Sequence, residues 1–281
     1  MKFGLYVPNF GSECSARSVA ELAQAAEVSG WDGLFLWDQI LENYKEAHPM
    51  VDPWVALAAA AMVTERIRLG TTVTAVARRR PWKLARETVT LDHLSNGRLT
   101  LSVGLGDPVE AEFTRFGEQA DPKLRAGKLD EGLAILANLW SGKAFKFQGQ
   151  HYRLERMRFA PPTMQTPRIP VWVGGWWPHK APFRRAARWD GAFPLKAGGS
   201  IVMTPQDVRD LRDFIRQQRG DPTPFDLVIM GTTPGDDARK ASKKLAAYQE
   251  TGLTWWLESL YRWRNSQEGL LRRIRQGPPA L

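Results

Sequence analysis

The sequence contains little cysteine and few histidines. Its 281 residues include one cysteine, Cys14, and four histidines. A single thiol cannot form an internal disulfide, which excludes disulfide-stabilised folds and fits a reducing compartment. No histidine lies near Cys14 in the sequence, so we expect a partly buried, inert thiol rather than a nucleophile. The histidines have no metal-ligand spacing, and no metal-binding residues are predicted.

Long hydrophobic segments are also missing. No apolar run approaches the ~20 residues that a membrane helix needs, so no membrane contact is expected. The first residues read directly as a strand, without the charged start and apolar core of a secretion signal. We therefore expect a cytoplasmic location.

Motifs that identify several enzyme classes are absent as well. The chain has no G-x-S-x-G motif, no Walker loop and no G-x-G-x-x-G after its first strand. Its formal net charge is +9, but the basic residues are scattered and no nucleic-acid motif accompanies them, so no nucleic-acid partner is expected. The run Arg78-Arg79-Arg80 either lies in solvent or contacts an anionic cofactor or substrate.

Residues 67–107 contain the clearest structural pattern. Residues 67–74 are rich in Val, Thr and Leu and predict a strand, and Pro81 suits the first position of a helix. Residues 99–103 predict a second strand, which ends in a glycine-rich turn. A strand–helix–strand crossover of this length indicates a parallel pair, and therefore an α/β protein.

The remainder of the chain continues this alternation. Eight strands are predicted, at residues 3–7, 33–37, 67–74, 99–103, 171–173, 190–194, 227–230 and 254–257. Eight strands that alternate with helices predict a (β/α)8 TIM barrel, and a doubly wound open sheet is the competing topology. Residues 144–159, after the fourth helix, predict an inserted β-hairpin. The whole chain, residues 1–281, is expected to form one domain.

Polar residues and glycines follow several of these strands. On a barrel they would converge on the carboxyl face, where active sites form. Glycines there allow a close approach of backbone to a ligand, although the formation of a turn is a sufficient explanation for each glycine taken alone. Gly174-Gly175, read as a turn in front of a helix, would present free N–H groups to a phosphate.

Several stretches together resemble the bacterial luciferase-like superfamily of flavin- and deazaflavin-dependent oxidoreductases. They are WDGLFLWDQI, VDPWVALAAAAMVTERIRLGTTVT, RRRPWKLARETVTLDHLSNGRLTLSVGLG, LDEGLAILANLWSG and IPVWVGGWW followed by FRRAARWDGAFP. The resemblance covers about residues 1–195 well and the rest thinly. It implies a TIM barrel with an insertion, which agrees with the strand count.

The resemblance also implies a cofactor, either FMN or coenzyme F-420, at the carboxyl face. It places a non-prolyl cis peptide at Thr72–Val73, behind the cofactor ring, and a phosphate-binding turn at Gly174-Gly175 beside Trp176. The residues expected to bind the cofactor are Asn9, Asp38, Thr72, Val73, Thr74, Gly104, Gly106, Asp107, Gly174, Gly175 and Trp176.

One position departs from the family pattern. Many deazaflavin-dependent relatives have Asp-His after the second strand, whereas this chain has Asp38-Gln39. A glutamine can form hydrogen bonds but cannot act as a general base near neutral pH. Asp38, Gln39 and Asp107 are the candidate catalytic residues, with either carboxylate able to replace the missing histidine unless the reaction needs no such group.

These inferences predict an FMN- or F-420-dependent oxidoreductase or monooxygenase that acts on a small organic substrate. NAD(P)H or a reductase partner is the expected electron donor, and a homodimer or other homo-oligomer is the expected assembly. A flavin-binding protein without turnover is the alternative, because Gln39 is compatible with a lost catalytic residue. A metal-dependent barrel hydrolase has much less support.

Overall fold

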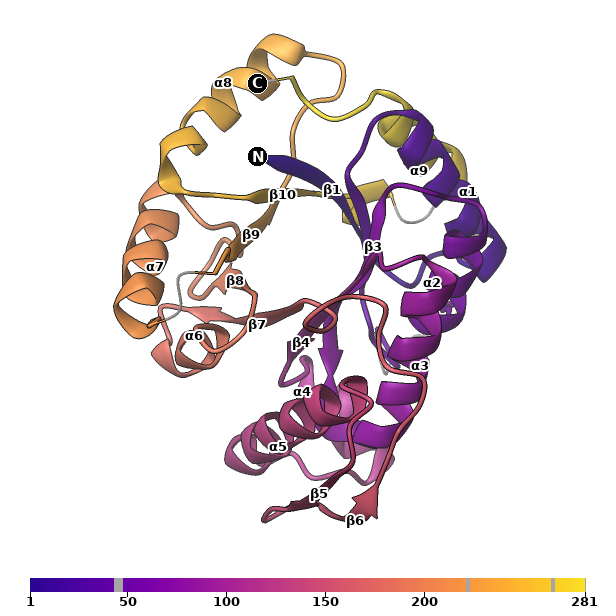
Figure 1. Ribbon diagram of the computed structural model, residues 1–281. Helices are drawn as coiled ribbons and strands as arrows, with labels where there is room; N and C mark the ends of the chain where they lie inside the picture. The colour runs from indigo at the N-terminus through magenta and orange to yellow at the C-terminus, as the bar shows by residue number, and fades with distance from the viewer. Residues whose placement is uncertain (43–47, 221–222, 264–265, 281) are drawn as a thin grey trace.

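The computed structural model describes residues 1–42, 48–220, 223–263 and 266–280. Eight parallel strands form a closed barrel in the order β1-β10-β9-β8-β7-β4-β3-β2, and helices surround it (Figure 1). This closure confirms the predicted TIM barrel and excludes an open, doubly wound sheet. Among the described residues, no helix is both long enough and apolar enough to cross a membrane.

The barrel strands begin and end within two residues of their predicted ranges, with one exception. They are β1 (Lys2–Val7), β2 (Gly33–Leu36), β3 (Arg68–Ala75), β4 (Leu99–Gly104), β7 (Val171–Trp177), β8 (Gly191–Lys196), β9 (Asp226–Gly231) and β10 (Trp255–Ser259). The exception is β7, which was predicted to end at Val173. It continues for four residues because each of them pairs with β8, from Gly174 opposite Phe193 to Trp177 opposite Lys196.

The helices begin where the sequence places caps and prolines. The longer ones are α1 (Ala16–Val28), α2 (Pro53–Met62), α3 (Pro81–Leu94), α5 (Pro122–Trp140), α6 (Lys180–Ala186), α7 (Pro205–Gln218), α8 (Ala238–Ala246) and α9 (Gln267–Arg275). At α2, the Asp52 carboxylate accepts hydrogen bonds from the backbone N–H groups of Trp54 and Val55, and Pro53 occupies the first turn. Thr204 and Asp207 form a capping box at α7.

Shorter elements occupy the connections. They are α4 (Val109–Glu112) and the 3₁₀ turns η1 (Val76–Arg78), η2 (Thr114–Phe116), η3 (Gln249–Thr251) and η4 (Tyr261–Trp263). After α5, the antiparallel strands β5 (Phe145–Gln148) and β6 (Arg153–Met157) form the predicted hairpin outside the barrel. The backbone N–H of Gly149 donates to the Tyr152 carbonyl and closes the turn.

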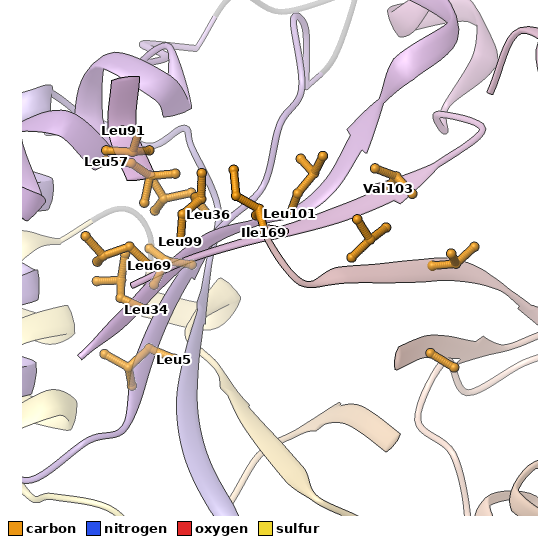
Figure 2. Packing of buried hydrophobic residues seen from close by; sticks show 14 of the residues in the cluster. Leu5, Leu34, Leu36, Leu57, Leu69, Leu91, Leu99, Leu101, Val103 and Ile169 are labelled. Carbon is orange, nitrogen blue, oxygen red and sulfur yellow. The ribbon is translucent and has the colours of Figure 1, made fainter. Parts of the chain in front are cut away.

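The two larger clusters of buried hydrophobic residues lie on opposite faces of the barrel strands, one inside the barrel and one outside it. The outer cluster lies between the strands and the helices and includes leucines of β1 to β4, α2 and α3 (Figure 2). The inner cluster includes Tyr6, Phe35, Trp172, Phe193 and Trp255, with Val73 packed against it. Successive strand residues alternate between the two clusters, so each side chain at a strand end can be assigned to the barrel interior or to the helix layer.

Candidate functional site

The carboxyl end of β3 is irregular where the resemblance predicts the cofactor ring. The Thr72-Val73 peptide bond is cis, as predicted. Thr71 pairs with Leu101 of β4, and the next pair is Thr74 with Val103, so the register shifts between Thr71 and Thr74. Val73 lies within this shift and is partly exposed.

Two predicted glycines lie on either side of Val73. A Cβ atom built on Gly104 would lie 2.8 Å from Val73 Cγ2, and one built on Gly174 would lie 2.7 Å from Val73 Cγ1. Real Cβ atoms do not approach other atoms this closely, so any larger residue would displace the Val73 side chain. The structure therefore brings Val73, Gly104 and Gly174 together from three neighbouring strands. We call this group the Val73 cradle.

The Gly174-Gly175 segment differs from its sequence interpretation as a turn before a helix. Both glycines lie inside β7, and α6 begins only at Lys180. Strand pairing with β8 explains the difference, because local sequence shows the glycines but not the partner strand. Gly175 faces α6, since a Cβ there would lie 2.4 Å from Pro182 Cβ. Close packing with α6 therefore accounts for this glycine.

Alternation along β7 also places the tryptophan that follows the glycines. Gly174 faces Val73, Gly175 faces α6, and Trp177 packs outward against Phe183 at a ring-centroid distance of 5.6 Å. Trp176 lies between Gly175 and Trp177, so it shares the inner face with Gly174. Its partial exposure at the carboxyl end of β7 leaves it accessible to a bound molecule.

Asp38 forms the centre of a buried ion-pair network. Its carboxylate accepts hydrogen bonds from Arg78 Nη2 (2.9 Å), from Arg79 Nη2 (2.9 and 3.0 Å) and from Thr74 Oγ1 (2.8 Å). Arg78 also donates through Nε to Glu112 at 2.6 Å. We call Asp38, Thr74, Arg78, Arg79 and Glu112 the Asp38 network.

The charges of the Asp38 network shift the acidity of its carboxyl groups. Burial alone would raise the pKa of Asp38, but Arg79, Arg78 and the Thr74 hydroxyl lower that pKa below its ordinary value. Burial is the larger effect at Glu112, whose pKa is raised despite Arg78. Asp38 is therefore a fully engaged carboxylate with little capacity to accept another proton, which favours a positioning role over a catalytic one.

The network also tests one of the two interpretations left open for the arginine run. The side chains of Arg78 and Arg79 are only 6% and 16% exposed, and both are ion-paired to Asp38. The solvated interpretation is therefore wrong for Arg78 and Arg79, whereas contact with an anionic cofactor or substrate stays a prediction. Only Arg80 of the three is exposed, with its guanidinium over the Trp82 ring.

Asn9 and Gln39 lie together at the rim of the barrel. Asn9 Nδ2 donates to the backbone carbonyls of Gln39 (2.9 Å) and Val51 (3.0 Å). Gln39 Nε2 donates to the Asp107 carbonyl at 3.3 Å. Asn9 Oδ1, Gln39 Oε1 and the Trp37 indole nitrogen are buried without hydrogen-bond partners in the described residues. Unpaired buried polar atoms are costly, so these three atoms are candidates for contact with a bound molecule.

The turn after β4 depends on a glycine at position 106 and on hydrogen bonds to Arg125. Gly106 has φ +85°, and a Cβ there would lie 2.7 Å from the Phe113 ring and 2.8 Å from Ala75 Cβ. The Leu105 and Gly106 carbonyls accept hydrogen bonds from Arg125 at 2.9 and 3.0 Å. Gly106 thus allows the turn to form, and the turn leaves Asp107 exposed at the rim beside Gln39.

Aromatic residues form a wall at the site, and the sequence interpretation did not assign Tyr6 or Phe193 to it. The Tyr6 ring lies 5.1 Å from Trp37 and 5.6 Å from Phe193, and Trp37 stacks on Tyr261 at 5.6 Å. Burial raises the pKa of Tyr6, so its hydroxyl stays protonated and can donate a hydrogen bond. Tyr6 occupies an inward position near the end of β1, a signal that strand alternation could have supplied. Glu112 gave no such signal, because it lies in a connecting segment.

Cys14 behaves as the sequence predicts. It is partly buried, and burial raises the pKa of its thiol to about 11 despite an opposing hydrogen bond involving the Val51 backbone. A thiol with this pKa is a poor nucleophile near neutral pH. Within the described ranges, no group of three or more His, Cys, Asp or Glu residues could hold a metal ion.

Comparison with known proteins places this site in a wider context. The family model described as luciferase-like monooxygenase matches residues 1–275. An uncharacterized protein of Mycobacterium tuberculosis (strain ATCC 25618 / H37Rv) is 34% identical over 210 residues, which cover 73% of this chain and 67% of that protein.

A second relative has a named activity. The F420-dependent glucose-6-phosphate dehydrogenase of Nakamurella multipartita is 31% identical over 221 residues, which cover 74% of this chain but 62% of that enzyme. The crystal structure of monooxygenase RslO1 from Streptomyces bottropensis superposes with a TM-score of 0.76 at 24% identity, covering 98% of this chain and 97% of that one. The structural match supports the fold.

Proposed function

Because the chain belongs to the luciferase-like monooxygenase family, we propose that it is an oxidoreductase that uses FMN or coenzyme F-420. The Val73 cradle is the observation that carries this proposal. Gly104 and Gly174 have no side chains to cover Val73, which lies at the carboxyl end of the barrel, where ligands of this fold bind. The family resemblance predicts the cofactor ring at this place.

The residues around the cradle fit an isoalloxazine-type ring. Val73 supplies an apolar surface for one face of the ring, and Trp176 lies on the same inner face of the barrel. Tyr6, Trp37 and Phe193 provide an aromatic wall. Aromatic side chains bury a large apolar area and contact other rings favourably. The wall therefore suits the ring of the cofactor or an apolar substrate beside it.

The rim residues provide the polar contacts. Asn9 Oδ1 and Gln39 Oε1 are acceptors without a partner among the described residues, and the Trp37 indole N–H and the protonated Tyr6 hydroxyl are donors. In this proposal they orient the ring and the substrate. Gln39 replaces the histidine of many deazaflavin-dependent relatives and contributes hydrogen bonds without proton transfer. Asp107 is the remaining catalytic candidate, because its carboxylate is exposed and Asp38 is engaged.

The support for the predicted phosphate contact is weaker than for the ring contact. The contact was predicted at Gly174-Gly175, but Gly174 faces Val73 and Gly175 faces Pro182. The contact remains a prediction for the carboxyl end of β7, where Trp176 is accessible. Asp38 and Thr74 take the positioning role, since the network connects the segments that follow β2, β3 and β4.

When bound, the cofactor supplies hydride transfer or oxygen activation, and the protein supplies binding and orientation. The proposed substrate is a small organic molecule at the aromatic wall, and NAD(P)H or a reductase partner supplies the electrons. A homo-oligomer in the cytoplasm remains the proposed assembly and location. A flavin-binding protein without turnover is the second candidate, which the absence of a histidine after Asp38 favours.

Two measurements on the purified protein test this proposal. Titration with FMN and, in parallel, with coenzyme F-420 should give saturable absorbance and fluorescence changes with one of them. Reduction of the bound cofactor by NAD(P)H, by a reductase or by a substrate panel then separates an enzyme from a binding protein. Saturable binding without any reduction would favour the second candidate, and failure of both cofactors to bind would refute both.

A further inference from the structure

A cavity that Val73, Gly104 and Gly174 do not line lies beyond the carboxyl ends of β9 and β10. It is formed by the segment after β9, by η4 and by α9, and its volume is about 600 Å³. In the barrel order, β9 and β10 lie across the ring from β3 and β4, which carry the cradle. The side chain of Leu257 belongs to the inner cluster and that of Trp256 to the outer one, so Glu258 does not face the cradle. The residues that line this cavity include none of the Val73 cradle and none of the Asp38 network.

The lining of this cavity is strongly basic. Lys244, Arg262, Arg272 and Arg273 line it, and Asp236 is its only acidic lining residue among those the structure describes. Arg262 and Arg272 are exposed and form no ion pair with another described residue. Lys244 Nζ donates a hydrogen bond to the Thr232 carbonyl at 2.8 Å, which positions the ammonium group at the edge of the cavity. Such an arrangement attracts an anion.

Arg273 gives an independent indication of a ligand. It lines the cavity but is only 3% exposed, and its Nη2 lies 3.1 Å from Thr233 Oγ1 and 3.4 Å from Glu258 Oε1. Its Nη1 donates to the Gly277 carbonyl at 3.1 Å. Its Nε is buried and has no hydrogen-bond partner in the described residues. A buried guanidinium N–H without a partner is costly, and an anion in the cavity would satisfy it.

The size of the cavity and its aromatic residue indicate that the anion is part of a larger organic molecule. A volume of about 600 Å³ suits a small organic molecule and exceeds what one phosphate fills. Trp263 lines the cavity, and the Arg262 guanidinium lies 4.5 Å from the centre of its ring. A planar base can pack against these groups while a phosphate contacts the arginines. In TIM barrels, the segments after the seventh and eighth strands, here β9 and β10, frequently bind phosphate.

We propose that this cavity binds a phosphate ester of nucleotide size, with Arg262, Arg272 and Arg273 on its phosphates and Trp263 against its base. Arginine forms two parallel hydrogen bonds with phosphate and remains charged at every physiological pH. The site is independent of the cofactor site, so its occupant neither requires nor replaces FMN or F-420.

Calorimetric titration of the purified protein with ADP, pyrophosphate and adenosine tests this proposal. ADP should bind most tightly, pyrophosphate more weakly and adenosine with no measurable heat. Arg272→Gln should weaken ADP binding by about tenfold or more, because a charge-assisted hydrogen bond is lost. Arg275→Gln is the matched control, since Arg275 is exposed on the same helix but does not line the cavity. It should leave ADP affinity within about twofold of the wild-type value.

Three results would overturn the proposal. The first is the absence of binding of both ADP and pyrophosphate at millimolar concentration. The second is equal weakening by Arg272→Gln and Arg275→Gln, which would mean that only the overall positive charge matters. The third is loss of ADP binding when the protein is saturated with whichever of FMN or F-420 it binds, which would place ADP in the cofactor site. Should neither cofactor bind, the first two comparisons still decide the matter.

Discussion

Replacing Asp38 by asparagine tests whether the Asp38 network stabilises the fold. The substitution keeps the shape of the side chain but removes its charge, and it leaves Arg79 facing an amide. Four contacts of 2.8–3.0 Å to Thr74, Arg78 and Arg79 depend on this carboxylate. Glu112 still pairs with Arg78 at 2.6 Å, whereas Arg79 keeps only the longer pair of its Nη1 with Glu87 at 3.6 Å, so the loss of compensation falls mainly on Arg79.

The size of the effect follows from this burial. Removing one partner of a buried ion pair costs about 3–5 kcal/mol, because the other charge stays buried without compensation. For a chain of this length, each kcal/mol lowers the melting temperature by roughly 2–3 °C. We therefore expect Asp38→Asn to melt roughly 6–15 °C below the wild-type protein.

Thermal unfolding followed by circular dichroism measures this difference. Asp213→Asn is the control, since Asp213 pairs with Arg212 at 2.8 Å but its side chain is 54% exposed. Exposed pairs contribute little, so this variant should melt with the wild-type protein. Adding Arg79→Gln to Asp38→Asn should recover part of the loss. Equal melting temperatures for Asp38→Asn and Asp213→Asn would show that the network does not stabilise the fold.

Three further predictions concern acidity and the rim of the site. The pKa of Asp38 is lowered in the folded state, so its contribution to stability is present above its unfolded value of about 3.9 and is lost as pH falls through the folded value. Wild-type protein should therefore lose stability relative to Asp38→Asn below about pH 4, as acid titration by circular dichroism would show; a constant difference between them would contradict this. The thiol of Cys14, with its pKa raised to about 11, should react with a disulfide reagent at pH 8 far more slowly in folded than in denatured protein, and equal rates would contradict the burial. Gln39→His should add an inflection near pH ~6.5 to the pH profile of cofactor reduction, and an unchanged profile would show that position 39 does not reach the reacting groups.

The barrel could be predicted because its signals are local. Apolar strands, capped helices and their strict alternation lie in the sequence itself, and the closed barrel follows from the number of repeats. The extension of β7 could not be predicted, since it depends on pairing with β8. The local sequence of Gly174 and Gly175 is typical of a turn, and they belong to a strand because they pair with Phe193 and Pro194 of β8.

The candidate site was predictable in part. The cis bond at Thr72-Val73 came from the family resemblance, and the structure confirms it. The contact of Val73 with Gly104 and Gly174 needs the registers of three strands, which no local pattern contains. The inward direction of Arg78 and Arg79 was not predictable either. It depends on Asp38, about 40 residues earlier in the chain. The sequence alone does not show whether a charged residue is exposed to solvent or paired with another charged residue.

The central claim is that the cofactor ring rests on Val73 between Gly104 and Gly174. The dissociation constants of wild-type protein, Gly174→Ala and Gly220→Ala for FMN and F-420 test it most directly. A methyl group at Gly174 would displace Val73, whereas at Gly220 no atom of the described part of the chain lies within 4 Å of an added Cβ. We expect Gly174→Ala to bind the cofactor at least about tenfold more weakly and Gly220→Ala to match the wild-type protein. Equal affinity in all three proteins would contradict the claim.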